Sequence, residues 1–77
     1  MFAVRLKEAR QARGLSQYAL GALVAASQDD VYRYEAGKIS PGLERLVALA
    51  KSLNVTADWL TGLSDRGGPR RRKLAAK

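Results

Sequence analysis

The sequence predicts an all-α fold made of five short helices. Apolar residues recur at the three- and four-residue spacing of a helix face from residue 2 to residue 62. Several of these segments follow a Ser or Thr, the residue types that cap a helix by accepting a hydrogen bond from a free backbone N–H. No stretch shows the alternating apolar and polar pattern of a strand.

The first helix is expected over residues 2–13, where three apolar residues share one face (Phe2, Leu6 and Ala9). Gly14 ends it, because glycine adopts the left-handed conformation of a helix end without a steric penalty. Ser16 caps the second helix, which reaches residue 24. Within that helix, Gly21 is small enough for a neighbouring segment to approach closely.

A turn at Ala25 and Ala26 leads to the third helix, which Ser27 is expected to cap. Asp30 stands three residues after Ser27, the spacing of a capping box in which Asp replaces the usual Glu. Gly37 ends this helix. Packing of the second helix against the third is expected to bury four residues (Leu20, Val24, Val31 and Tyr34).

The fourth helix is expected to begin at Ser40-Pro41, because proline fits the first turn of a helix, and to stop at Asn54. Five residues are expected to form its apolar stripe (Leu43, Leu46, Val47, Ala50 and Leu53). Thr56 then caps a short fifth helix that ends at Gly62. We expect Trp59 in this helix to belong to the core, since apolar residues flank it.

The composition excludes several kinds of site. The 77-residue chain contains no cysteine and no histidine, which removes disulfides, thiolate metal sites, most zinc sites and the usual general base. No apolar run approaches the roughly 18 residues of a membrane span, and no secretory signal is visible. A cytoplasmic location is therefore expected, with no cofactor or metal.

The net charge of +7 is not spread evenly along the chain. Residues 1–65 hold eight Lys and Arg against seven Asp and Glu, a balance of +1, whereas residues 66–77 hold six Lys and Arg and no acid, a balance of +6. We expect a helical domain over residues 1–65 and a basic, disordered tail over residues 66–77, in which Gly67-Gly68-Pro69 separates the arginine run from the helical pattern. The tail is either a solvated segment or an arm attracted to phosphates.

Three strings carry the most specific signal: Leu15-Ser16-Gln17-x-x-Leu20, Val31-x-x-Tyr34-Glu35-x-Gly37-Lys38 and Leu46-x-x-Leu49-Ala50-x-x-Leu53-x-Val55-x-x-Asp58-Trp59-Leu60. In this order and spacing they resemble the Cro/lambda-repressor type of helix-turn-helix regulator, also called the XRE family. The resemblance covers residues 2–62. It implies a compact five-helix, lambda-repressor-like DNA-binding domain whose second helix crosses the DNA backbone and whose third helix lies in the major groove. Family members often carry Gly where this chain has Ala25.

The resemblance implies three base-reading residues on the third helix. Arg33 suits guanine and Gln28 suits adenine, each through two hydrogen bonds, and Asp29 accepts a bond from cytosine N4. Each is also an ordinary choice for a solvent-exposed helix face, and Asp29 favours the positive end of the helix dipole. Phosphate contacts are implied for four further residues (Gln17, Ser27, Tyr32 and Lys38). Arg10 and Glu35 match a structural ion pair of the family.

The sequence therefore predicts a transcriptional regulator, acting as a repressor, that binds double-stranded DNA at a palindromic operator as a homodimer. The homodimer is expected to form through residues 55–63, with Leu60 and Leu63 in the interface. An enzyme is not expected, since the acidic residues are assigned to caps and an ion pair and no nucleophile–base pair remains. One alternative is an antitoxin or similar partner-binding protein, and another is a protein-interaction module without strong DNA binding.

Overall fold

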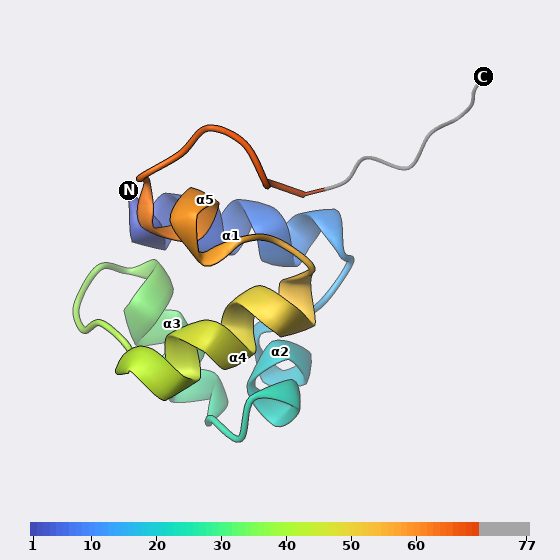
Figure 1. Ribbon diagram of the computed structural model, residues 1–77. Helices are drawn as coiled ribbons and strands as arrows, with labels where there is room; N and C mark the ends of the chain where they lie inside the picture. The colour runs from blue at the N-terminus through green and yellow to red at the C-terminus, as the bar shows by residue number, and fades with distance from the viewer. Residues whose placement is uncertain (70–77) are drawn as a thin grey trace.

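The computed structural model describes residues 1–69 and has five α-helices and no strand in that range. The helices follow one another as α1 (Phe2–Ala12), α2 (Gln17–Leu23), α3 (Gln28–Glu35), α4 (Leu43–Leu53) and α5 (Ala57–Thr61). Figure 1 shows α1 and α5 side by side, and α1 also packs on α3, which in turn packs on α2. The predicted all-α, five-helix fold is confirmed.

The predicted N-caps are confirmed at three helices. In each, a hydroxyl oxygen accepts a hydrogen bond of 2.9 to 3.0 Å from the backbone N–H three residues later (Ser16 from Ala19, Ser27 from Asp30, and Thr56 from Trp59). The predicted helix ends also adopt left-handed backbone at Asn54, with φ of 58°, and at Gly62, with φ of 92°. Local capping therefore determines where most of the helices begin and end.

The predicted start of the fourth helix was wrong by two residues. α4 begins at Leu43, and Gly42, not Ser40-Pro41, stands at its N-cap position. Gly42 has φ of −70° and ψ of 176°, an extended conformation that cannot continue a helical turn. Because glycine has a low helix propensity but is tolerated at an N-cap, Gly42 stands before the helix and Leu43 is its first residue.

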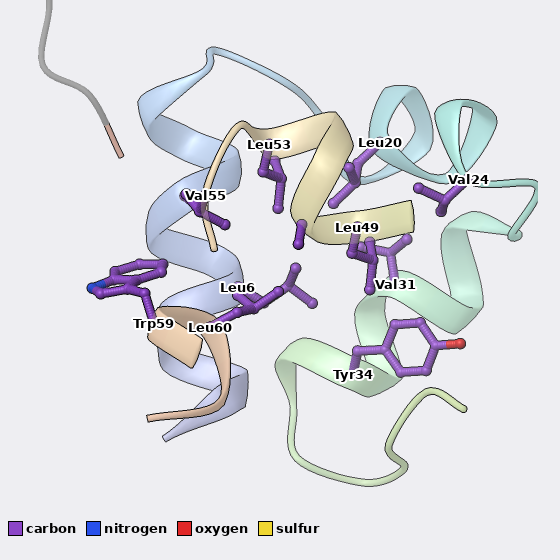
Figure 2. Close-up of a cluster of buried hydrophobic side chains, with 12 residues drawn as sticks. Leu6, Leu20, Val24, Val31, Tyr34, Leu49, Leu53, Val55, Trp59 and Leu60 are labelled. Carbon is purple, nitrogen blue, oxygen red and sulfur yellow. The ribbon is translucent and has the colours of Figure 1, made fainter. Parts of the chain in front are cut away.

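One cluster of buried apolar side chains, drawn in Figure 2, holds the helices together. It includes the four residues expected between the second and third helices, and Trp59, which is 5% exposed. The expected stripe of α4 was partly wrong, because Leu43 is 75% and Val47 is 40% exposed, while Leu49 is fully buried. Val47 lies about 100° around the helix from Leu46, and Leu43 lies in the first turn, beyond the cluster.

The chain after α5 folds back over α1 and α5 rather than leaving the body at the predicted boundary of residue 65 (Figure 1). The Thr56 N–H donates to the Gly67 carbonyl at 2.9 Å. The Arg5 guanidinium lies 4.8 Å over the Trp59 ring and donates to the Trp59 carbonyl at 2.6 Å. Residues 70–77 of the expected tail lie outside the described residues.

Within the described part of the chain, no helix has both the length and the apolar character to cross a membrane.

Candidate nucleic-acid interface

The turn between α2 and α3 brings these two helices into close contact. A Cβ atom at Gly21 would lie 2.6 Å from the carbonyl oxygen of Ala26, so a larger residue does not fit there. The Gly21 carbonyl in turn accepts a hydrogen bond of 2.8 Å from the Ala26 N–H. Ala25 has φ of 59°, where a residue with a Cβ costs roughly 1 kcal/mol relative to glycine. The turn is thus close-packed and carries some backbone strain.

A buried polar cluster joins α1, the start of α2 and the end of α3. Arg10 Nε lies 2.6 Å from Glu35 Oε2, and the two side chains are 11% and 4% exposed. Arg10 also donates to Glu35 Oε1 at 3.0 Å and to the Leu15 carbonyl at 2.8 Å. Gln17 donates to Glu35 Oε1 at 3.1 Å. The structure therefore places Arg10 and Glu35 in contact and adds Gln17, whose amide keeps a second N–H for an external acceptor.

The outward face of α3 is polar. Gln28, Asp29, Tyr32 and Arg33 are all exposed. Arg33 Nη2 lies 2.8 Å from Asp29 Oδ2, an ion pair one helical turn apart whose side chains are 50% and 63% exposed. Two of the expected base-reading residues are therefore paired with each other in the free protein, at a position open to solvent.

A shallow hollow of about 270 Å³ lies between α2 and α3 and brings together Gln17, Gln28, Asp29 and Tyr32. Four of the seven residues expected to contact DNA thus share one surface. Ser27, at the N-cap of α3, already accepts the Asp30 N–H. Lys38 is exposed just beyond the other end of α3. The expected contact residues therefore extend along α3 from its N-terminus to its C-terminus.

The sequence analysis assigned no role to Arg45 of α4, which contacts both the α2–α3 turn and α3. Its guanidinium donates to the Tyr34 hydroxyl at 3.1 Å and to the Ala25 carbonyl at 3.2 Å, and lies 3.7 Å from Asp30 Oδ2. The capping box expected at Asp30 is therefore only half formed: its N–H bonds Ser27, but its carboxylate faces Arg45. The sequence held no signal for Arg45, because its partners lie 11 to 20 residues away.

The chain is similar to known regulators in sequence. A family model described as Helix-turn-helix matches residues 6–60. The uncharacterized HTH-type transcriptional regulator YobD of Bacillus subtilis (strain 168) is 31% identical over 70 residues, covering 91% of this chain and 62% of the relative. The SPbeta prophage-derived uncharacterized HTH-type transcriptional regulator YonR of the same strain is 35% identical over 60 residues, covering 78% of this chain and 56% of the relative. The chain spans about three-fifths of the length of these two relatives.

Solved structures agree with the sequence match. The P22 c2 repressor in complex with a synthetic operator has a TM-score of 0.76 and 30% identity to this chain, covering 78% of this chain and 91% of that one. The restriction-modification controller protein C.AhdI from Aeromonas hydrophila has a TM-score of 0.72 and 34% identity, covering 77% of this chain and 89% of that one. The family match, the relatives and the arrangement of α2 and α3 lead to one conclusion: the chain belongs to the Cro/lambda-repressor type, or XRE, family of helix-turn-helix regulators.

Proposed function

We propose that this chain regulates transcription by binding double-stranded DNA sequence-specifically, with α3 in the major groove and the start of α2 against the phosphate backbone. The observation that carries the proposal is the exposed polar face of α3, which presents Gln28, Asp29 and Arg33 from a helix braced by α1 and α2. A helix of this kind fits the major groove, where base edges display distinct donors and acceptors.

Each proposed base contact has a chemical partner. Arg33 pairs with guanine O6 and N7, Gln28 with adenine N6 and N7, and Asp29 accepts from cytosine N4. The exposed Asp29–Arg33 pair contributes at most about 1 kcal/mol, whereas a two-bond base contact is worth about 1–3 kcal/mol. A guanine in the correct position can therefore displace Asp29 from Arg33, while the Asp29 charge repels phosphates and lowers the affinity for other sequences.

We assign phosphate contacts to Gln17, Ser27, Tyr32 and Lys38. Gln17 and Ser27 lie at the N-termini of α2 and α3, where backbone N–H groups and the helix dipole favour an anion. Tyr32 is 51% exposed beside Gln17, and Lys38 is exposed beyond the C-terminus of α3. Such contacts set the position of the protein on the duplex without reading its sequence.

We further propose that two copies bind a palindromic operator as a homodimer and act as a repressor. Two α3 helices on half-sites about 34 Å apart give specificity that one small module lacks. Leu60 is fully buried and is not available for the interface expected around it, but Leu63 is 82% and Met1 is 70% exposed. A Cβ at Gly62 would lie 2.7 Å from Met1 Cγ, so Met1 lies at the end of α5, and its exposure together with that of Leu63 supports a contact surface there.

The experiment compares Arg33→Ala with Lys38→Ala on an operator selected from random duplex DNA, with each base pair varied in turn. Arg33→Ala should cost about 1–3 kcal/mol and relax the preference at one base pair per half-site. Lys38→Ala should weaken binding to all duplexes alike and lower the slope of log affinity against log salt by about 0.9. If both variants lose affinity uniformly, α3 is not the reading helix.

A further inference from the structure

We propose that Arg45 of α4 is a positioning residue that fixes the α2–α3 turn and, through it, the orientation in which α3 is presented to DNA. The inference rests on the proposed function, in which α3 reads the operator. It assigns specificity to a residue that lies outside both helices of the helix-turn-helix unit.

The Arg45 guanidinium contacts three separate points of that unit. It donates through Nη1 to the Tyr34 hydroxyl at 3.1 Å and through Nη2 to the Ala25 carbonyl at 3.2 Å, and it lies 3.7 Å from Asp30 Oδ2. Ala25 belongs to the loop between α2 and α3, Asp30 to the first helical turn of α3, and Tyr34 to its last helical turn. Because the guanidinium is planar and its donors have a fixed geometry, these contacts constrain the turn and the helix relative to α4.

The α2–α3 turn contains a strained residue, so contacts from another helix are most useful there. Ala25 has φ of 59°, a backbone conformation that glycine adopts freely and alanine does not. Tyr34 is 4% exposed, and Figure 2 shows its hydroxyl at the edge of the core cluster. Arg45 donates a hydrogen bond to this hydroxyl. One side chain therefore pairs with a buried hydroxyl and with the carbonyl of the strained residue.

A second reading would make Arg45 a direct phosphate contact. The side chain is 31% exposed, and two of its nitrogens already donate to Tyr34 and Ala25. A guanidinium has five N–H donors, so a phosphate contact would use the remaining ones, whereas a positioning role depends on the two bonds already made. The two roles differ in their dependence on salt, because only a phosphate contact releases a counterion from the DNA.

The first experiment uses the free protein and needs no DNA. Amide hydrogen exchange is measured by NMR for the wild type, Arg45→Ala, Arg45→Lys and the control Lys51→Ala, which removes an exposed charge from the same helix. Amides of residues 24–31 should exchange about 2- to 10-fold faster for each hydrogen bond lost in Arg45→Ala, while those of α5 stay unchanged. Exchange in Arg45→Lys should be as fast as in Arg45→Ala, since lysine keeps the charge but lacks the planar guanidinium that donates to two acceptors at once. Unchanged exchange in the turn would overturn the proposal.

A matched variant tests whether the bond to the Tyr34 hydroxyl is part of the mechanism. Tyr34→Phe removes one acceptor of Arg45 and keeps the buried ring. It should speed exchange in the turn less than Arg45→Ala does, and the double variant should be no faster than Arg45→Ala alone, because coupled residues are not additive. Fully additive effects would show that the two residues act independently, contrary to the proposal.

The second experiment measures affinity for the selected operator and for a scrambled duplex at several salt concentrations. Arg45→Ala and Arg45→Lys should both lower the ratio of operator to scrambled affinity while leaving the salt slope as in the wild type. A slope reduced by about 0.9 in Arg45→Ala only, with both duplexes weakened equally, would show a phosphate contact instead. If the wild type does not distinguish the two duplexes, the proposed function fails, and the exchange experiment still decides whether Arg45 fixes the turn.

Discussion

Replacement of Glu35 by Ala should remove much of the stability of the domain. Glu35 accepts two hydrogen bonds from Arg10 and one from Gln17, and its side chain is 4% exposed. Arg10, which is 11% exposed, would then keep only the Leu15 carbonyl as a partner. Leaving one charge of a buried pair without its partner costs about 3–5 kcal/mol. A domain of this size has a total stability of about 3–10 kcal/mol, at about 0.05–0.15 kcal/mol per residue.

The free energy of unfolding can be measured by urea titration with fluorescence of Trp59, the only tryptophan in the chain, which is 5% exposed. A loss of 3–5 kcal/mol should lower the melting temperature by at least about 12 °C in a domain of this size. Glu44→Ala, which removes an exposed carboxylate from α4, is the matched control and should change little. A loss below about 1 kcal/mol for Glu35→Ala would show that the pair behaves as a solvent-exposed ion pair and not as a buried one.

Two further predictions follow from the packing and from the charge distribution. Gly21→Ala should destabilise the domain by about 1–3 kcal/mol in the same urea titration, because the added Cβ would meet the Ala26 carbonyl oxygen at 2.6 Å; an unchanged midpoint would show that the α2–α3 turn yields readily. Removing residues 70–77, which hold five Lys and Arg, should weaken binding to every duplex and flatten its salt dependence while leaving the ranking of operators unchanged. An unchanged salt slope would show that the tail does not contact phosphate.

The truncation is placed after Pro69 because the chain still packs on the body beyond residue 65. The Gly67 carbonyl accepts the Thr56 N–H, and a Cβ at Gly68 would lie 2.8 Å from the Trp59 ring. A cut at residue 65 would remove these contacts together with the charge. A loss of affinity would then have two causes that the assay could not separate.

Most of the fold could be predicted because its signals are local. The caps at Ser16, Ser27 and Thr56 each depend on residues within three positions, and the end of α4 at Asn54 depends on one residue that tolerates left-handed backbone. The burial of Trp59 follows from its apolar neighbours. Periodicity and capping are therefore sufficient to predict a structural feature when its physical cause lies within one or two helical turns along the chain.

Most of the errors concern features set by distant segments, whereas the late start of α4 has a local cause at Gly42. Leu43 and Val47 have the right residue type for a core, but both are exposed and lie outside the cluster that the packed helices form. Leu60 is buried by elements from the other end of the sequence, which a local pattern does not reveal. Arginine is usually a surface residue, and the contacts of Arg45 form only when α4 lies beside the α2–α3 turn. The DNA-contact residues stay predictions, since they depend on a partner that the sequence does not contain.

The most direct test of the account is selection of bound sequences from random duplex DNA, carried out in parallel with the wild type and with Arg33→Ala. We expect the wild type to enrich a motif with dyad symmetry and half-sites about 10 base pairs apart. The Arg33→Ala selection should return the same motif with the preference for guanine lost at one position in each half-site. Recovery of no enriched motif from the wild type, or of an unchanged motif from Arg33→Ala, would contradict the claim that α3 reads the operator.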